Sequence, residues 1–225
     1  MQLLMSADQH GKWPVFNWLL TVARERHIDA IVLAGDLLGC PDGFDTPEEA
    51  QRHDANRVNE LLATAEIPVF YVMGNDDLVE LNSNSDQVQS VHERQVRLGR
   101  FTIVGYQYSL PFMGGTFEKP DAAIEVDLAP LAGFVDADAI FVSHTPAFGI
   151  LDPGFRESQI GSRSLRQFLD TKPFLAHIHG HSHAGFGRNG KHFNVASAGR
   201  QRAMLLDTET MKHEVLDLEP RKLEA

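Results

Sequence analysis

Short apolar segments alternate with longer amphipathic ones through most of this chain, and this alternation limits the fold more than any other feature. The short segments are rich in β-branched residues and bounded by Gly, Asp, Pro or Ser, as is typical of buried strands. Strand, helix, strand alternation favours parallel sheets with crossover helices, so it predicts an α/β domain. The expected strands are 3–5, 30–34, 69–73, 101–104, 139–142 and 175–178, and the expected helices 14–27, 47–65 and 162–170.

The end of the chain has a different pattern. Arg188-Asn189-Gly190-Lys191 indicates a tight hairpin turn. Further strands are expected near 192–195, 203–207 and 213–218, with no room for helices between them. The sequence therefore predicts one domain over residues 1–225 that ends in an antiparallel β meander from about 186 to 218.

Two segments, 78–97 and 106–132, fit neither pattern. The first is polar with weak helical character, and the second contains Gly114-Gly115 and three prolines. We expect both to be surface loops near a site, and the second could cap that site.

Composition excludes several classes of protein. Hydrophobic residues make up 43% and charged residues 23% of the 225 residues, which is typical of a folded globular protein. Twenty Lys and Arg against 31 Asp and Glu give a formal charge of −11, so binding to a nucleic-acid backbone is disfavoured. No signal peptide or membrane-spanning segment is expected, because the first residues lack a basic flank and no apolar run approaches ~20 residues. Cys40 is the only cysteine, so we expect a reducing compartment, the cytoplasm, and no intrachain disulfide.

Side chains that can bind metals follow the expected strands, each at the point where a strand ends. The carboxyl ends of parallel strands meet at one sheet edge, where ligands bind. Residues two apart in an extended chain also point the same way. The sequence therefore predicts that two carboxylates, four imidazoles and one amide share a cavity: Asp8, His10, Asp36, Asn75, His144, His181 and His183.

Seven such groups exceed the needs of one tetrahedral ion. A bridging carboxylate would let them serve two ions about 3.5–4 Å apart. Nitrogen and oxygen ligands without thiolate suit Mn²⁺, Fe, Zn²⁺ or Ni²⁺ better than Ca²⁺ or Mg²⁺. We expect two divalent ions and favour manganese.

The same residues resemble the motifs of the calcineurin-like metallophosphoesterases, which are D-x-H, G-D, G-N-H-[D/E], G-H and G-H-x-H in that order. The corresponding segments span residues 8 to 183, and the segment 144–152 is similar to the small phosphodiesterase-like branch of the family. The resemblance implies two facing sheets flanked by helices, a four-layer α/β/β/α sandwich. The segments are Asp8-Gln9-His10, Gly35-Asp36, Gly74-Asn75-Asp76-Asp77, Ser143-His144 and Gly180-His181-Ser182-His183.

The resemblance also implies the role of each ligand. One ion would be held by Asp8, His10, Asp36 and His183, and the second by Asp36, Asn75, His144 and His181, with Asp36 bridging. A hydroxide held between the ions would attack phosphorus in line with the leaving oxygen, without a covalent intermediate. The implied substrate is a small phosphorylated compound, with a phosphodiester somewhat favoured over an activated phosphomonoester.

Two positions depart from the family pattern. Ser143 stands where the family usually has glycine, and Asp76 stands where most relatives have a histidine that helps protonate the leaving group. An ionised carboxylate cannot donate a proton. Three explanations stay open: the leaving group is good, another residue donates, or the site keeps Asp76 protonated. The candidate catalytic residues are Asn75, Asp76 and Asp77, with His179 as another stand-in.

Further residues are candidates for binding the substrate. Arg156, Arg163 and Arg200 could orient a phosphate through bidentate hydrogen bonds, although an ordinary surface arginine is the favoured interpretation of each. His179 is a candidate for the same role, whereas His177 is expected to pack or hydrogen-bond within its strand.

Three classes of function compete. The first is the metal-dependent phosphoesterase. The second is a non-catalytic metal-binding scaffold of the same fold that acts in protein interaction, which the loss of the histidine at position 76 would allow. A nuclease, the third, would need an electropositive groove that an acidic chain does not favour. Association into a homo-oligomer stays open.

Overall fold

The computed structural model describes residues 1–218, in which the strands form two mixed sheets of six strands each. β1 to β4 run parallel, and β11 and β12 continue that sheet in antiparallel fashion. In the second sheet β6, β7, β8 and β10 run parallel, with antiparallel strands at both edges. The order in the first sheet is β12 (His213–Asp217), β11 (Arg202–Asp207), β1 (Gln2–Ser6), β2 (Ala30–Ala34), β3 (Val69–Val72) and β4 (Val88–Ser90). The order in the second is β5 (Gln95–Leu98), β6 (Phe101–Tyr106), β7 (Ala139–Ser143), β8 (Ala176–His179), β10 (His192–Asn194) and β9 (Gly187–Asn189).

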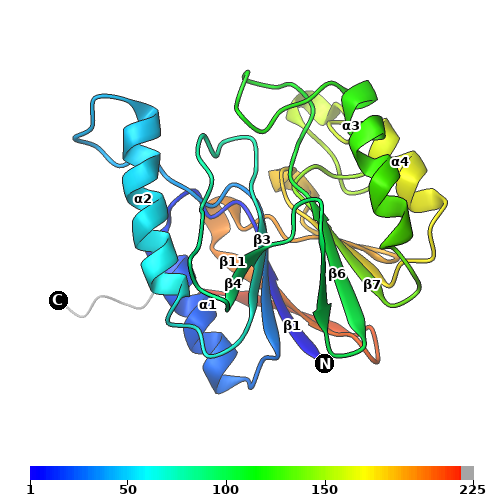
Figure 1. The fold of residues 1–225 in the computed structure, drawn as a ribbon, viewed down its shortest axis with the longest axis horizontal. Helices are drawn as coiled ribbons and strands as arrows, with labels where there is room; N and C mark the ends of the chain where they lie inside the picture. The colour runs from blue at the N-terminus through cyan, green and yellow to red at the C-terminus, as the bar shows by residue number, and fades with distance from the viewer. Residues whose placement is uncertain (219–225) are drawn as a thin grey trace.

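Four α-helices of the described chain cover the outer faces of the two sheets (Figure 1). α1 (Trp13–Glu25) and α2 (Pro47–Leu62) pack on the first sheet, and α3 (Asp121–Leu128) and α4 (Arg163–Asp170) pack on the second. Single 3₁₀ turns follow some of these elements: η1 (Ala129–Gly133), η2 (Phe155–Glu157), η3 (His183–Gly185) and η4 (Ala198–Arg200). The expected four-layer α/β/β/α sandwich is confirmed.

Alternation of side chains along each strand divides the core into three apolar layers. In β1, Leu4 packs toward α1 and α2, whereas Leu3 and Met5 point into the space between the sheets. In β7, Phe141 faces α3 and α4, and its neighbour Ile140 faces the first sheet. Because these strands are buried on both faces, they appear in the sequence as continuous apolar runs.

Two segments that were expected to be loops contain short regular elements. α3 lies within 106–132, and only Ile124 and Leu128 of this helix are buried, which leaves too short an apolar stripe for a periodicity to be visible. β4 lies within 78–97 and has only three residues, and β5, a partly exposed edge strand, begins in this segment and ends at Leu98.

The predicted antiparallel meander over 186–218 is wrong. β9 and β10 do form the expected hairpin at Gly190, but β10 also pairs in parallel with β8. The second hairpin, β11 and β12, joins the other sheet through β1. The strand pattern specifies which residues are extended, whereas the partner depends on burial, and Phe193 of β10 and Met204 of β11 both bury their side chains between the sheets.

The prediction of one domain over 1–225 includes 219–225, which lie outside the described residues. Within residues 1–218, no helix combines the length and the apolar character needed to cross a membrane.

Candidate metal centre

Five loops bring the predicted ligands together at one edge of the sandwich. Three of these loops follow β1, β2 and β3 of the first sheet, and two follow β7 and β8 of the second. The sheets converge there, since Ala7 after β1 forms a parallel bridge with Ala196 after β10. Side chains from both sheets can therefore reach one point.

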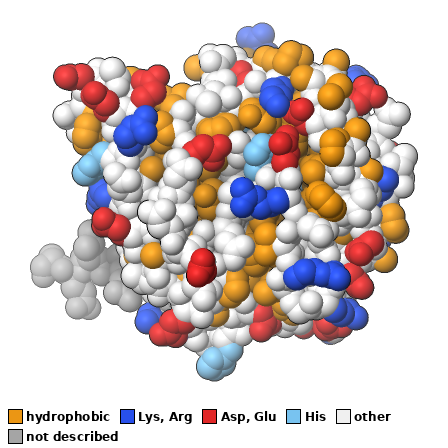
Figure 2. Space-filling view, in the orientation of Figure 1, with side chains coloured by type: hydrophobic (Ala, Val, Ile, Leu, Met, Phe, Trp, Pro, Cys, Tyr) orange, Lys and Arg blue, Asp and Glu red, His pale blue; other side chains and the backbone are white. Residues whose placement is uncertain are grey.

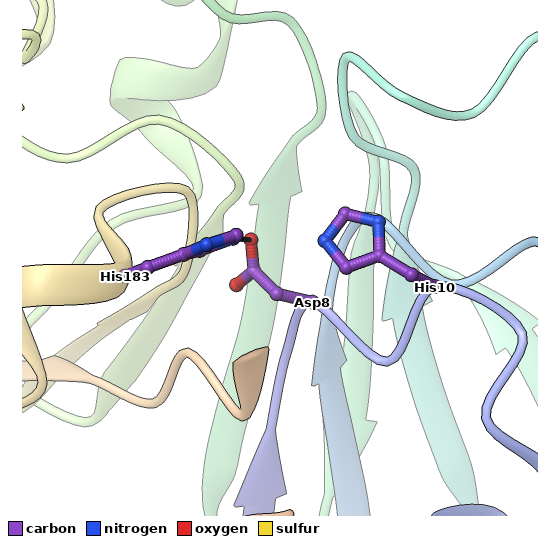
Figure 3. Close-up of side chains that lie close together, drawn as sticks. All are labelled: Asp8, His10 and His183. Carbon is purple, nitrogen blue, oxygen red and sulfur yellow. Dashed lines mark hydrogen bonds and ion pairs between the residues drawn. The ribbon is translucent and has the colours of Figure 1, made fainter. Parts of the chain in front are cut away.

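Asp8 is the centre of the first cluster (Figure 3). Its fully buried carboxylate accepts hydrogen bonds from His183 Nε2 at 3.1 Å and from the backbone N–H of His181 at 3.1 and 3.2 Å. The carboxylate lies between the imidazoles of His183 and His10. One potential ligand atom from each of these three side chains lies within 4.8 Å of the other two.

Asp36, Asn75 and His144 form a second, buried group. His144 Nε2 lies 3.3 Å from Asp36 Oδ2 and 3.0 Å from Asn75 Oδ1. His144 Nδ1 hydrogen-bonds the carbonyl of Ala34 at 2.9 Å, so Nδ1 carries a proton and Nε2 faces the two oxygens. Three atoms that offer lone pairs converge on this point when the imidazole is neutral, which is an arrangement that attracts a cation.

The electrostatics of this group favour positive charge. Burial opposes protonation of His144, but the charges of Asp36 and Asp8 and the hydrogen bonds to Asp36 and to the carbonyl of Ala34 together raise the pKa of His144 to about 10. Burial likewise opposes ionisation of Asp36, but the charges of His144 and His10 and the hydrogen bonds from His144 and the Asp76 backbone together lower the pKa of Asp36 to about 2.

Asp36 links the two groups. One oxygen of its carboxylate lies within 4.8 Å of potential ligand atoms of Asp8 and His144, and the same holds for His10 and Asp76. The ring of His181 lies beside His144, with 5.0 Å between the ring centroids. The seven predicted ligands are thus gathered at one place, and Asp36 belongs to two of the groups of potential ligand atoms found there.

The backbone at four of these seven residues is in the left-handed region: φ is 59° at Asp8, 47° at His10, 53° at Asp36 and 65° at His181. Such values are uncommon outside glycine and cluster at functional sites. Hydrogen bonds hold the loops in this form, from Asp8 N–H to the carbonyl of Gly35 (2.8 Å) and from His10 N–H to that of Asp36 (2.9 Å).

Three glycines leave room for the ligands. A Cβ on Gly35 would collide with the ring of His144, a Cβ on Gly74 with the carboxylate of Asp36, and a Cβ on Gly180 with the carboxylate of Asp8. Each glycine immediately precedes a ligand in the sequence. The loops can approach each other only because these positions lack a side chain.

The donor set fits divalent metal ions. The residues of this site offer buried carboxylates, imidazoles and an amide oxygen and include no cysteine, which suits cations such as Mn²⁺, Fe²⁺ or Zn²⁺. Outer hydrogen bonds orient the ligands, as that from His144 to Ala34 shows.

Asp76 lies at the site, as expected, but Asp77 does not. Asp76 accepts a hydrogen bond from Asn75 Nδ2 at 2.8 Å and lies 3.5 Å from His10 Nδ1, with its side chain half exposed. Burial, followed by the charge of Asp36, raises the pKa of Asp76. The Asp77 carboxylate is fully buried and accepts N–H groups of Leu37, Leu38 and Gly74. Its position corrects the expectation of a catalytic role: Asp77 fixes the loops after β2 and β3.

His179 is also placed differently from the prediction. It is fully buried in β8, its ring stacks on that of His177 with 4.9 Å between centroids, and it does not line the cavity beside the cluster. The local role expected for His177 is confirmed, because His177 Nε2 lies 2.8 Å from Ser143 Oγ and Nδ1 lies 2.9 Å from His192 Nδ1.

The three candidate arginines belong to three different elements, η2, α4 and η4. Arg156 is exposed beside the ring of Phe155, at 5.2 Å from its centroid. Arg163 instead stacks on Phe148 at 3.6 Å, and Arg200 is exposed in η4. Of these, Arg156 has a neighbour that lines the cavity described next.

A cavity of about 400 Å³ opens beside the cluster. Asp36, Asn75, Asp76, His181 and His183 form its polar wall. Its apolar wall includes Phe112 and Phe155, which no sequence pattern marks because both belong to segments without periodicity.

Arg202 is a further residue near the site that was not predicted from the sequence. It is 9% exposed, donates to the carbonyls of Ala196 and His183, and stacks on Phe186 at 3.6 Å. The sequence feature that could have identified it is its place at the start of the apolar segment 202–206. A guanidinium buried there needs hydrogen-bond partners. Arg202 thus supports the loop that carries His183.

This fold and site define an α/β/β/α sandwich protein with an acidic, histidine-rich centre where the two sheets converge. A family model described as calcineurin-like phosphoesterase matches residues 1–185. The chain therefore belongs to the calcineurin-like phosphoesterase family, as the sequence motifs indicated, and it is a metal-dependent phosphoesterase by family.

Solved structures agree with this fold. The protein TT1561 of Thermus thermophilus superposes with a TM-score of 0.72 at 20% identity, over 96% of this chain and 98% of that chain. A dimetal phosphatase from Danio rerio, LOC 393393, has a TM-score of 0.59 at 12% identity, over the same shares of both chains. An archaeal phosphodiesterase has a TM-score of 0.50 at 11% identity, over 97% of this chain and 100% of that chain. No curated protein matches the sequence.

Proposed function

We propose that this chain hydrolyses a phosphodiester, or an activated phosphomonoester, of a small molecule with the help of two divalent metal ions. The observation that carries the proposal is the meeting of Asp36 with His144 and Asn75, and of Asp8 with His183, at one edge of the sandwich. These side chains come from five different loops, so chance proximity is a poor explanation.

The geometry supports a division of the ligands between two ions. Asp8, His10, Asp36 and His183 would hold one ion, and Asp36, Asn75, His144 and His181 the other, with Asp36 shared. Bound cations supply a water of lowered pKa and neutralise charge that develops on the phosphoryl group. We favour manganese, while Fe, Zn²⁺ and Ni²⁺ suit the same donors.

The residues of this chain would bind and orient the substrate. The phosphoryl group would occupy the part of the cavity that Asp36, Asn75 and His181 line. Asp76 lines the same wall and is the nearest candidate to carry a proton to the leaving oxygen. The names of two solved structures of this fold, a phosphodiesterase and a dimetal phosphatase, support the same class of reaction.

Metal content and turnover test this proposal together. We expect purified protein to bind two equivalents of Mn²⁺ and to hydrolyse bis-p-nitrophenyl phosphate only when the metal is present. Elemental analysis after dialysis and release of nitrophenolate measure the two properties. Failure to bind Mn²⁺, Fe²⁺, Zn²⁺ or Ni²⁺ would contradict the proposal.

The second candidate, a metal-binding scaffold, is favoured by one observation: Asp76 stands where the family has its histidine. Such a scaffold would hold the metal ions but show no turnover of any mono- or diester tested. The enzymatic proposal expects turnover, so the same experiment separates the two.

Partners and location follow from the same reasoning. On the face shown in Figure 2, Lys and Arg side chains are scattered among acidic ones and form no continuous basic stripe. Together with the charge of −11, this favours a small phosphorylated substrate over a nucleic acid. The exposed free thiol of Cys40 is compatible with the proposed cytoplasmic location.

A further inference from the structure

Two loops present phenylalanine rings to solvent at the cavity beside the metal centre. Phe112 is 69% exposed and Phe155 is 82% exposed, and both line the cavity. Met113, next to Phe112, is 78% exposed. Exposed large apolar side chains at the rim of a cavity are a common feature of binding sites.

The loop that carries Phe112 is held in a defined shape. The carboxylate of Glu118 accepts hydrogen bonds from the successive N–H groups of Phe112, Met113 and Gly114, at 2.8, 2.9 and 2.9 Å. These three bonds fix the backbone on both sides of the aromatic ring.

The same loop is anchored to the segment that carries Asn75. Thr116 Oγ1 donates to the carbonyl of Leu78 at 3.1 Å, and a Cβ on Gly115 would lie 2.5 Å from the carbonyl oxygen of Asn75. The ring of Phe112 stands edge-on to that of His181, with 6.4 Å between centroids and 88° between planes. Phe112 is therefore positioned with respect to two candidate ligands.

The loop that carries Phe155 is anchored to the turn that follows β8. The carboxylate of Asp152 accepts N–H groups of Gly149 and Gly161, at 2.9 and 3.1 Å, and so closes the loop at its base. Ser182 Oγ, between His181 and His183, donates to the carbonyl of Pro153 at 2.7 Å. The position of Phe155 is thereby tied to the turn that holds two further candidate ligands.

The size and character of the cavity indicate what it binds. A volume of about 400 Å³ falls within the range of sites for small organic molecules, and a phosphoryl group fills only a small part of it. The rest of the wall is largely apolar, with Pro153 and Ile160 beside the two phenylalanines. Aromatic side chains bind flat apolar groups well, because stacked or edge-to-face rings are favourable beyond the area they bury.

We infer that the substrate carries a planar aromatic group on an ester oxygen, and that Phe112 and Phe155 bind this group while the phosphoryl group occupies the metal centre. Phe112 and Phe155 are thus specificity-determining residues, and Glu118 and Asp152 position them. This inference rests on the proposed function, because it places the phosphoryl group at the metal ions.

Two phosphonates that cannot be hydrolysed test the inference by binding alone. Phenylphosphonate and methylphosphonate share the head group and differ in the aromatic ring. We expect the Mn²⁺-loaded protein to bind phenylphosphonate about tenfold more tightly, measured by calorimetric titration. In the double variant Phe112→Ala, Phe155→Ala, this preference falls to near onefold while the affinity for methylphosphonate is unchanged.

Control variants isolate the ring from other effects. Phe44→Ala removes another exposed phenylalanine, 41% exposed and outside the cavity, and keeps the preference. Phe155→Leu retains apolar area without a flat ring and lowers the preference. Because both cavity phenylalanines are largely exposed, their removal leaves the core intact, and an unchanged melting temperature verifies this.

The outcomes separate the inference from the proposed function. Equal affinity of the unmodified protein for the two phosphonates, or a preference that survives in the double variant, overturns the inference and leaves the phosphoesterase proposal standing. Binding of neither phosphonate in the presence of bound metal overturns both.

Discussion

His144 Nε2 lies 3.3 Å from Asp36 Oδ2, although the two residues follow strands of different sheets. Both side chains are almost fully buried, so this contact joins the loops after β2 and β7 where little water screens their charges. The charge of Asp36 raises the pKa of His144, and the charge of His144 lowers the pKa of Asp36. A metal ion at this position would replace the proton on His144 Nε2, while Nδ1 would keep the proton that it donates to the carbonyl of Ala34.

Removal of the shared carboxylate should abolish the centre. We expect Asp36→Asn to bind less than two equivalents of Mn²⁺ and to lose about a hundredfold or more of its turnover, since loss of outer hydrogen-bond partners alone costs 10–100-fold. Elemental analysis and nitrophenyl ester hydrolysis measure both effects. The exposed Asp42→Asn is the matched control. Full metal content in Asp36→Asn would contradict the shared role.

The glycine before Asn75 should be intolerant of any side chain. In Gly74→Ala the new Cβ collides with the carboxylate and backbone of Asp36, so the loops must separate. We expect loss of stability on the order of 2 kcal/mol and at least tenfold weaker metal binding, measured by urea unfolding and metal titration. Gly133→Ala, where a Cβ meets nothing within 4 Å, should leave both properties unchanged.

Asp76 should determine which leaving groups are accepted. Its half-exposed side chain lines the cavity, so a histidine can be accommodated there. We expect Asp76→His to raise kcat/KM for phenyl phosphate at least tenfold relative to p-nitrophenyl phosphate, because imidazolium donates a proton near neutral pH. Asp76→Asn, which cannot donate, should change this ratio in the opposite direction. An unchanged ratio in both variants would show that position 76 does not protonate the leaving group.

Stability should fall in mild acid because of a histidine outside the centre. Burial, followed by the charge of Lys119, lowers the pKa of His92 from 6.5 to about 4, while Asp127 opposes the shift. Between these values the unfolded chain binds more protons than the folded one, so the contribution of His92 is present above pH 6.5 and is lost as the pH falls toward 4.

The variant His92→Phe removes this titration. We expect its free energy of unfolding to fall less between pH 7 and 4.5 than that of the unmodified protein, by roughly 2 kcal/mol. Urea unfolding at both pH values measures the difference, and the exposed His53→Phe is the control. Equal losses in the unmodified protein and in His92→Phe would refute this assignment.

The sequence predicts the candidate ligands that directly follow a buried strand. Asp8 with His10, and Asp36, Asn75 and His144, each follow an apolar run, and parallel strands bring such ends to one edge. The sequence does not show which of the alternating histidines 177, 179, 181 and 183 face the site. His179 ends the strand with its side chain buried, and the left-handed backbone at His181 turns the following residues toward the cavity.

The sequence by itself determined the α/β class, the buried strands and the order of the candidate metal-binding residues, because these depend on side-chain periodicity and on neighbours in the chain. Only the tertiary structure decided that β10 and β11 enter different sheets, that Asp77 binds backbone amides, and that Phe112 and Phe155 meet at one cavity. These features depend on contacts between distant segments, where burial and hydrogen bonding select the partner and local pattern carries no information about it.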